Sequence, residues 1–416
     1  TTLTMANDYE GLLDEFAMIV PVPEILTEED VRVVDPGVFT TLRRYSAPRL
    51  VSYTCDQLYP DPERSFPMTG NPLGCTGGYG DSGSDGDADS NGSNNYSYGV
   101  QVESRFIVGE YEIVILSAEE SGALLGWLDS EGYTVPTNTS TLIQEYLDAG
   151  SYFFAARVFA DRLPDGQDSL SPLQFGYDAE VFSLPIRLGT ANSSGVQDLI
   201  IYGIASLADG RLGISSYDEA TVPSTCLTDT DDLGAFYQDA FEEAVDGDEA
   251  SWVTEYGWAV EEVSVKCDPC PEDIDAGQPI STSELFSLGF DLDSVSDDTT
   301  YGYSNYFYVP DYYFTRLHVR YTPEQATQDL TLYHSRITED TQQRYIVYES
   351  YLENLYEICG SGWAKDPGSC ADVSRKYARR VQGTESGCAV SRPSQGTGLA
   401  GLLASLLGLA VLRRRS

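Results

Sequence analysis

Two cysteines in the second half of the chain, Cys267 and Cys270, have the C-x-x-C spacing of thiol oxidoreductases. In such a site the first cysteine opens a helix after a strand, and the helix N-terminus lowers the pKa of its thiol. Here Pro271 follows directly, and the acidic stretch EDIDAG (272–277) comes next. Negative charges disfavour a thiolate. We therefore expect a structural disulfide at this motif, with an extracytoplasmic thiol oxidoreductase as the alternative.

The cysteines as a set indicate an oxidising compartment. The chain has eight of them, which is more than a protein of the reducing cytosol usually carries. Cys55 with Cys75 and Cys359 with Cys370 could form local bridges, and a zinc site would gain only Cys226 as a further ligand. With Cys388 set aside because it belongs to the C-terminal motif considered below, Cys226, Cys267 and Cys270 remain, so one of these three would stay free or pair with a cysteine that precedes this sequence. The disulfide candidates are Cys55, Cys75, Cys226, Cys267, Cys270, Cys359 and Cys370.

An acidic loop offers oxygen ligands for a hard cation. From Asp87 the chain reads D-x-D-x-N-G, with Asp87, Asp89 and Asn91 alternating before Gly92. This order matches the first six positions of an EF-hand-type calcium loop, whose twelfth position is a bidentate Glu. Tyr98 stands at that position here. We therefore expect residues 76–99 to be a disordered acidic insertion, and weak calcium binding is the alternative.

Histidine chemistry has few candidates. The two histidines, His318 and His334, lie in no metal-site or triad spacing, and the motifs HExxH, GxSxG and GxxxxGK[ST] are absent from the sequence. A hydrolase would have to use carboxylates that no pattern singles out. Arg316, His318 and Arg320 alternate within FTRLHVRYT and so share one face of a strand. We expect a solvated face that is paired with the abundant carboxylates.

A tyrosine-rich run, YGYSNYFYVPDYYF, occupies residues 301–314. In a strand, Tyr306 and Tyr308 would lie on one face and Phe307 on the other, so part of the run belongs to the core. Tyrosine has an apolar ring and a polar tip, and a sugar-stacking surface is therefore the alternative.

Composition narrows the class of protein. Hydrophobic residues make up 41% and aromatic residues 12% of the 416 residues, enough for a packed core. The formal net charge is −42, from 66 acidic and 24 basic residues. Such a surface repels phosphate backbones, so we expect no nucleic-acid partner. It favours solubility outside the cell.

Hydrophobic periodicity predicts an α+β fold of mainly antiparallel strands with a few packed helices. In the first half, strands are expected at 15–23, 105–116 and 151–159, with a tight turn at Gly109. An S-x-x-E capping box at Ser117 and Glu120 predicts the start of a helix. Its buried stripe would be Leu124, Trp127 and Leu128, and its end Gly132. Further helices are expected at 38–45 and 141–149.

In the second half, the strands on either side of Asp209-Gly210 are expected to form an antiparallel hairpin. A helix is predicted at 232–245. The stretch 267–300 is rich in Asp, Ser and Pro and is expected to be loop-like. Strands are predicted at 303–310, 314–322 and 330–335.

Several long segments resemble a bacterial family catalogued as domain of unknown function 2330. They are DEFAMIVPVP (14–23), YSAPR (45–49), VGEYEIVILSAEESGALLGWLDSEGY (108–133), SLSPLQFGYDAEVFSLPIRLG (169–189), VQDLIIY (196–202) and FTRLHVRYTPEQATQDL (314–330). The resemblance implies an exported protein with no established activity, cofactor or catalytic residue. Because the chain begins TTLTM, we also expect that a signal peptide has been removed.

The C-terminal end resembles the sorting tag of myxobacteria. Its parts are Gly387 and Cys388, a polar spacer, the apolar segment Leu399–Leu412, and Arg413, Arg414 and Arg415. As a helix, the roughly fourteen apolar residues would be about 21 Å long, shorter than the roughly 30 Å hydrocarbon core. They make a temporary membrane stop, with the arginines at the cytoplasmic face. The resemblance implies cleavage or lipid attachment near Cys388 by a sorting protease, in concert with export machinery. A retained tail anchor is the alternative.

Together these features predict three parts. Residues 1–345 form the family domain, 346–387 a cysteine-bearing extension and 388–416 the sorting tag. We expect an exported, disulfide-bonded protein at the outer membrane or cell surface of a Gram-negative bacterium, with a structural or binding role.

Overall fold

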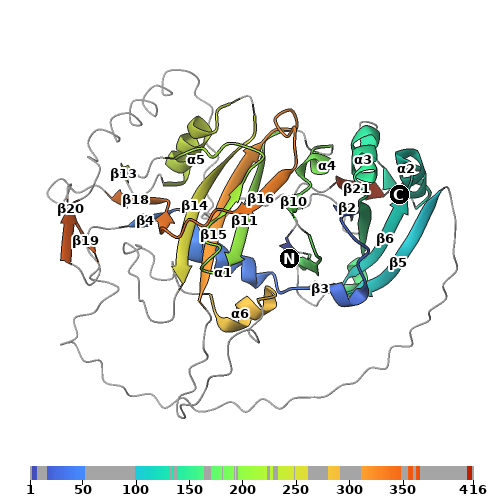
Figure 1. The fold of residues 1–416 in the computed structure, drawn as a ribbon, viewed down its shortest axis with the longest axis horizontal. Coiled ribbons are helices and arrows are strands. Elements are labelled where there is room, and N and C mark those ends of the chain that lie inside the picture. Colours follow the sequence, from blue (N-terminus) through green and yellow to red (C-terminus); the bar gives the residue numbers. More distant parts are fainter. Residues whose placement is uncertain are drawn as a thin grey trace, which may run out of the picture.

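The computed structural model describes residues 2–6, 16–51, 99–131, 133–134, 139–163, 170–179, 181–191, 193, 195–222, 225–227, 233–247, 249–260, 280–290, 311–347, 355–358, 362–365 and 410–414. Within these ranges the chain is an α+β protein, as expected, with mainly antiparallel sheets and six α-helices. In Figure 1 the six-stranded sheet lies at one end of the described part and the four-stranded sheet near the middle, with smaller sheets between them and at the other end.

A six-stranded sheet contains most of the N-terminal third of the chain. In sheet order its strands are β5 (Val100–Val108), β6 (Tyr111–Ala118), β8 (Tyr152–Val158), β2 (Phe16–Val22), β21 (Ala410–Arg414) and β7 (Tyr133–Thr134). Every pairing is antiparallel. The turn between β5 and β6 uses Gly109 at φ +57°, a conformation that favours glycine.

Both faces of this sheet are covered by apolar contacts. On one face Leu116 and Phe153 pack against the helices α2 (Ser121–Ser130) and α3 (Thr139–Asp148). On the other face Phe154 stacks on Phe175 of a small sheet, at 5.2 Å between ring centroids. That small sheet consists of β1 (Thr2–Met5), β9 (Leu173–Gly176) and β3 (Val31–Val33).

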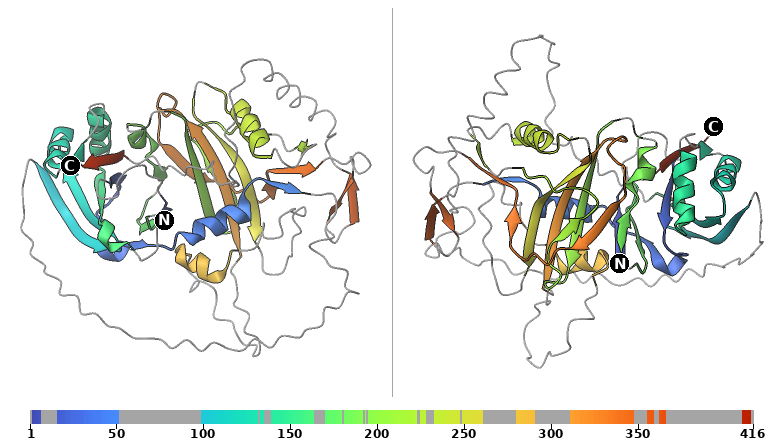
Figure 2. Two further views of the ribbon diagram at one scale, coloured as in Figure 1. Left: turned by 180° about the vertical axis from the view of Figure 1, so that it is seen from behind. Right: turned by 45° about the horizontal axis from the view of Figure 1, so that its top comes forward.

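The second of the two larger sheets has four strands. Its order is β11 (Gln197–Ala205), β15 (Tyr312–Tyr321), β14 (Ser251–Val260) and β17 (Thr341–Gln342). One face packs through Leu199, Ile201 and Leu317 on a further sheet. That sheet is β10 (Phe182–Leu184), β16 (Leu330–His334) and β12 (Leu212–Ile214). The opposite face contacts the helices α1 (Gly37–Ser46), α5 (Leu233–Ala244) and α6 (Thr282–Ser287), which Figure 2 shows from two further sides.

The remaining elements are short. They are α4 (Ile186–Thr190), the parallel trio β13 (Thr225–Leu227), β18 (Arg344–Val347) and β4 (Arg49–Val51), and the pair β19 (Leu355–Ile358) and β20 (Gly362–Lys365). Among the described residues no helix is both long and apolar enough to cross a bilayer.

Most of the elements predicted from periodicity are confirmed, but the capping box is wrong. Ser117 belongs to β6, and its hydroxyl donates to Glu103 of the neighbouring strand at 2.5 Å. The helix α2 begins at Ser121, with Glu120 as its N-cap. The stripe of Leu124, Trp127 and Leu128 is buried as expected.

The predicted hairpin at Asp209-Gly210 is also wrong. The strands on its two sides belong to different sheets, because β11 pairs with β15 and β12 pairs with β16. A Cβ at Gly203 would lie 2.9 Å from the Leu212 side chain. The strands β11 and β12 therefore pack face to face in two different sheets. In a hairpin they would be hydrogen-bonded edge to edge in one sheet.

The loop-like stretch 267–300 contains a helix. Ser281 caps α6 by accepting from the Glu284 amide, and the Glu284 carboxylate accepts in return from the Ser281 amide. This reciprocal capping box stabilises a helix of only six residues. Residues 267–279 and 291–300 lie outside the described ranges.

Candidate functional site

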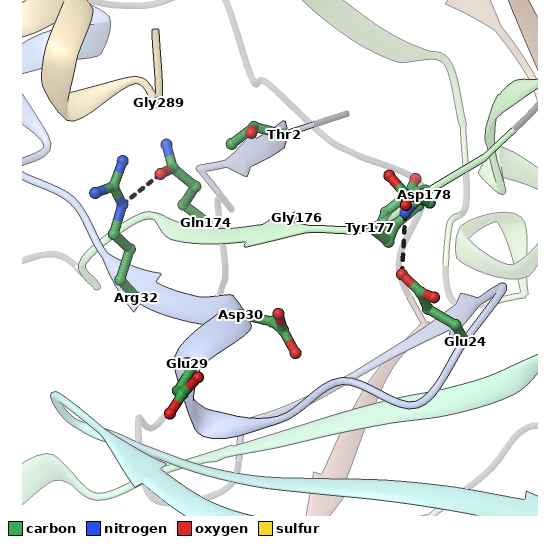
Figure 3. A pocket seen from close by; sticks show the side chains of 10 residues that line it. All are labelled: Thr2, Glu24, Glu29, Asp30, Arg32, Gln174, Gly176, Tyr177, Asp178 and Gly289. Carbon is green, nitrogen blue, oxygen red and sulfur yellow. Dashed lines mark hydrogen bonds between the residues drawn. The ribbon is translucent and has the colours of Figure 1, made fainter. Parts of the chain in front are cut away.

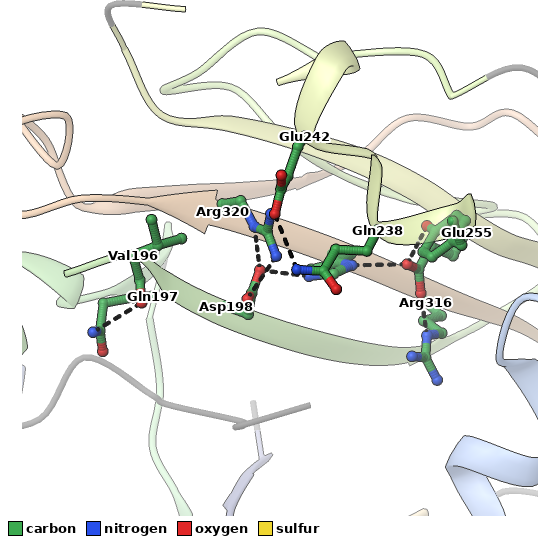
Figure 4. Close-up of polar contacts among 10 residues, drawn as sticks. Val196, Gln197, Asp198, Gln238, Glu242, Glu255, Arg316 and Arg320 are labelled. Carbon is green, nitrogen blue, oxygen red and sulfur yellow. Dashed lines mark hydrogen bonds and ion pairs between the residues drawn. The ribbon is translucent and has the colours of Figure 1, made fainter. Parts of the chain in front are cut away.

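A line of cations runs along one face of β15. Arg316, His318 and Arg320 alternate in the strand and so point the same way. In the antiparallel register Asp198 of β11 lies directly opposite Arg320. The Arg320 guanidinium donates two hydrogen bonds to this carboxylate, from Nε to Oδ1 at 2.7 Å and from Nη2 to Oδ2 at 3.0 Å. Figure 4 shows these contacts across the sheet.

Glu255 supplies the second carboxylate from the opposite neighbouring strand. The register of β14 against β15 shifts between Thr254 and Tyr256, so Glu255 is the extra residue of a β-bulge, a feature that re-aims a side chain. Its carboxylate accepts from Arg316 Nε at 2.5 Å and from the Tyr237 hydroxyl at 2.5 Å. Glu255 and Arg316 are both 0% exposed.

His318 lies between the two carboxylates. Its Nδ1 is 2.8 Å from Glu255 Oε1 and its Nε2 is 2.9 Å from Asp198 Oδ1. An ionised carboxylate only accepts, so both ring nitrogens donate and the ring is an imidazolium. Burial disfavours the charged ring, but the charge of Glu255 and the hydrogen bonds to both carboxylates outweigh burial and raise the pKa of His318.

The carboxylates respond in the opposite direction. Burial alone would raise their pKa values. Hydrogen bonds from His318 and Arg320 nevertheless lower the pKa of Asp198 to about 2. The charges of Arg316 and His318 lower that of Glu255 to about 2. Both carboxylates are therefore ionised at neutral pH.

The helix α5 closes this group of charges. Phe241 stacks on the His318 ring at 4.0 Å between centroids, and the Arg320 guanidinium lies 5.0 Å from the centre of the same phenyl ring. Glu242 accepts from Arg320 Nη1 at 3.2 Å. The expectation of a solvated face is thus wrong: the residues pair with carboxylates as predicted, but beneath a helix, and His318 is only 5% exposed.

We call Asp198, Glu255, Arg316, His318, Arg320 and Glu242 the charge clamp. Three cations face three carboxylates in it. Glu242 is about half exposed, whereas the other five charged groups are largely buried and each is paired, as buried charges require. A histidine between carboxylates is also a common acid–base arrangement. Here both ring nitrogens are already bonded and Phe241 covers the ring. The geometry therefore holds α5 on the sheet and leaves neither ring nitrogen of His318 free to exchange a proton with a substrate.

A cleft of about 890 Å³ lies beside the clamp, along the outer edge of β11. Its lining includes the whole run Leu199–Ile204, part of β1, and apolar side chains of α1, β10 and β16. Among the described residues that line it there is no Asp, Glu, Lys or Arg, and His334 is the only histidine. Tyr202 joins cleft and clamp, because it lines the cleft and its hydroxyl accepts from Arg316 Nη1 at 3.2 Å.

A second hollow of about 510 Å³ is acidic. Figure 3 shows Glu24, Glu29 and Asp30 along one chain segment, with the Glu24 carboxylate accepting from the Asp178 amide at 3.0 Å. Asp30 is bonded to Thr27 at 2.7 and 2.8 Å. Within the part of the chain that the structure covers, no three His, Cys, Asp or Glu side chains are grouped to hold a metal ion.

The family follows from a comparison with known proteins. A family model described as "Uncharacterized protein conserved in bacteria (DUF2330)" matches residues 1–333. The chain belongs to the DUF2330 family. Neither the curated proteins nor the solved structures include a significant match to it.

The matched DUF2330 region contains the whole charge clamp and nearly all of the cleft, whose last lining residue is His334. The cysteines Cys359, Cys370 and Cys388 and the arginine-rich end lie beyond the match. In this chain, therefore, the clamp and nearly all of the cleft lie within the region that matches the family model.

Most residues singled out in the sequence lie outside the described ranges. This holds for the proposed calcium ligands Asp87, Asp89 and Asn91, for Gly387 and Arg415, and for seven cysteines. Those cysteines are Cys55, Cys75, Cys267, Cys270, Cys359, Cys370 and Cys388.

The backbone of three other residues is described. Cys226 lies in β13, opposite Ile346 of β18. Arg413 and Arg414 lie in β21, opposite Thr134 and Tyr133 of β7. These positions test neither the disulfide nor the sorting prediction.

Sequence reasoning missed Asp198 and Glu255. Each is a single carboxylate within an otherwise apolar or aromatic strand, in QDLIIY (197–202) and WVTEYGW (252–258). A lone acidic residue in such a strand needs a buried cation. The cations that alternate in β15 were the available partners.

Proposed function

We propose that this DUF2330 protein is exported to the outer surface of a Gram-negative bacterium and works there by binding a partner in the cleft beside β11. The observation that carries the binding role is the cleft itself. Its volume of about 890 Å³ falls in the range of ligand sites, which are concave and mostly apolar.

The mouth of the cleft adds to this argument. Val181 lines the cleft and is 61% exposed, and Tyr333, also in the lining, is 45% exposed. Exposed apolar side chains that cluster around an apolar hollow often mark an interaction site, whereas single exposed apolar side chains elsewhere on a surface usually do not.

The export part of the proposal draws on the sequence. The eight cysteines and the net charge of −42 suit an oxidising, extracellular setting. The end of the chain combines Gly387-Cys388, an apolar segment and three arginines, which together resemble a sorting tag. A sorting protease and export machinery are the partners that such a tag requires.

The tag and the sheet compete for the same residues. Ala410–Arg414 forms β21, which pairs with β2. A segment engaged with a membrane cannot at the same time be a strand of this sheet. The proposal therefore requires β21 to leave β2 during sorting, and the edge of β2 to lose this partner once the tag is cut.

The export test is mass spectrometry of the protein recovered from fractions of its native cells. We expect it at the outer membrane or cell surface, ending near Cys388 or carrying a lipid there, with oxidised cysteines. Replacing Arg413, Arg414 and Arg415 with Ala should retain it inside the cell, while replacing Arg379 and Arg380 should not. An intact chain with reduced cysteines in the cytosol would refute export.

The binding test uses Nile red, a neutral apolar dye whose emission shifts to the blue in an apolar site. We expect the full chain to bind it and Val181→Lys to weaken binding. Val196→Lys is the matched control, because Val196 is 56% exposed but does not line the cleft. Equal titrations for the two variants would place the dye elsewhere and remove the cleft from the proposal.

A further inference from the structure

The outer edge of β11 has no strand partner in the described chain. Its nine residues pair with β15 on one side, and β11 is the first strand of its sheet. No backbone hydrogen bond outside this ladder involves Gln197–Ala205 among the described residues. The edge thus presents a row of free amides and carbonyls, which is the template for a further strand.

The cleft follows this edge. Consecutive residues of a strand point to opposite faces, so a hollow on one face would touch only every second residue. The cleft touches six in a row, Leu199 to Ile204. It also touches Thr2, Leu3 and Thr4 of β1, which is the edge strand of its own sheet. The hollow therefore lies between two strand edges.

We propose that this cleft binds an extended peptide of a partner protein, which adds as a strand to the free edge of β11. The proposal rests on the binding role given above and names its ligand class. An acyl chain or another purely apolar ligand would cover the free amides and carbonyls of β11 without bonding them. That desolvation is unfavourable. Only another extended backbone satisfies a whole row of them.

The walls select the side chains of the peptide. Leu184 and Leu332 stand on one side of the β11 edge, and Phe39 and Leu42 of α1 stand on the other. Both faces of an added strand would therefore be buried, and strands of that kind are continuously apolar. At about 3.4 Å per residue, a strand alongside Leu199–Ile204 has six residues and is roughly 20 Å long.

Charge selects the flanks of the peptide. Within the described ranges no acidic or basic side chain other than His334 lines the cleft, so the six central residues of the peptide are uncharged. The protein around it carries a net charge of −42, which attracts cations by long-range steering. The peptide is therefore an apolar segment of six residues with basic residues on both sides.

A second copy of this chain fits the cleft less well. Pairing β11 with β11 of another molecule would bring a whole sheet against the edge. The walls from α1 on one side and from β10 and β16 on the other stand beside this edge, and a docking sheet would have to displace them, whereas a single extended chain would not.

The probe is acetyl-Lys-Lys-Val-Ile-Val-Leu-Val-Ile-Lys-Lys-amide, titrated into the full chain by isothermal titration calorimetry. The matched control peptide is N-methylated at all six central amides, so it keeps its side chains and loses its donors. Each hydrogen bond lost is worth roughly a factor of two to ten in affinity. We expect the control to bind at least about tenfold more weakly, and equal affinity would overturn strand addition.

Val181→Lys places a cation at the cleft mouth. We expect its affinity for the probe to be about tenfold lower than that of Val196→Lys. If both variants weaken binding of the probe equally, the probe is attracted by the overall negative charge of the protein. That result would contradict binding in the cleft. Hydrogen exchange supplies an independent readout. The bound probe should protect amides of Gln197–Ala205 and leave those of β6 unchanged, and unprotected β11 amides with the probe bound would refute the proposal.

Other outcomes separate this inference from the proposed function. Nile red binding that Val181→Lys weakens, together with no probe binding, would keep the cleft as a binding site and reject the peptide. Probe binding only after removal of residues 388–416 would identify the apolar tail of this chain as the occupant and reject a partner protein. Export is decided by the fractionation and is unaffected by either result.

Discussion

The two larger sheets are each covered on both faces, but they bury different side chains. Between the six-stranded sheet and its covers lie Leu116, Phe153 and Phe154 with their apolar neighbours. Its charged group Arg105, Glu112 and Arg157 is only partly buried. The four-stranded sheet instead buries the charge clamp between β15 and α5.

The difference has an energetic meaning. Apolar burial is non-directional and depends little on any single partner. A buried ion pair has to recover the desolvation of both ions, so its worth depends on every member being present. The apolar packing of the first sheet should therefore tolerate conservative changes and contribute the same stability at any pH, whereas the second sheet should respond strongly to the loss of one charge.

The largest expected effect comes from breaking the clamp. Arg316→Met keeps much of the side-chain volume but leaves Glu255 without its guanidinium. We expect a loss of about 3–5 kcal/mol in the free energy of unfolding, measured by urea denaturation. Arg105→Met is the control: Arg105 is 47% exposed in its pair with Glu112, and such pairs contribute about 0–1 kcal/mol.

The same experiment can be sharpened with a double variant. Replacing both partners, Arg316→Met with Glu255→Leu, removes the unpaired charge and should recover part of the loss. Equal, small losses for Arg316→Met and Arg105→Met would mean that the clamp does not stabilise the fold.

The apolar sheet should behave differently. Leu116 is fully buried, and Leu116→Ala removes its packing and leaves a cavity, at a loss of about 2–5 kcal/mol. Because no titrating group is involved, the loss should be the same at pH 4 and pH 7. A loss that varied with pH would show that the two sheets are not energetically separate.

Acid should weaken the clamp. The pKa of Asp198 falls from 3.8 to about 2 on folding. Its contribution, on the order of 2 kcal/mol, is present above about pH 4 and is lost as the pH falls toward 2. Asp198→Asn lacks this carboxylate, so the stability difference between it and the wild type should shrink over that range. A constant difference would contradict the assignment.

His318 acts in the other direction. Its pKa is raised on folding, so its contribution is complete below its ordinary value of 6.5 and is lost as the pH rises through the higher folded value. Urea denaturation between pH 6 and 9 should show this loss in the wild type and not in His318→Gln.

Local patterns predicted the apolar sheet well and the clamp poorly. The stripe of Leu124, Trp127 and Leu128 follows from helical period alone, and the turn at Gly109 from a single glycine between two strands. The bulge that turns Glu255 toward Arg316 depends on the pairing of strands some sixty residues apart, which no local pattern encodes. The same reason explains why the predicted hairpin at Asp209-Gly210 is wrong. The local sequence around Gly203 and Leu212 indicates two strands, but it does not indicate which sheet each strand joins.

The smallest expected effect tests whether the turn of the apolar sheet obeys local rules. Gly109 has φ +57°, and a Cβ there would lie 2.9 Å from Val33 Cγ1. We expect Gly109→Ala to lower the free energy of unfolding by about 1–2 kcal/mol, because an L-residue is strained in that region. Gly126 in α2 is the control, since a Cβ there meets nothing within 4 Å, and Gly126→Ala should raise stability by about 0.5–1 kcal/mol. If both substitutions shift the urea midpoint in the same direction, local conformation does not govern this sheet and its difference from the clamp is smaller than the packing implies.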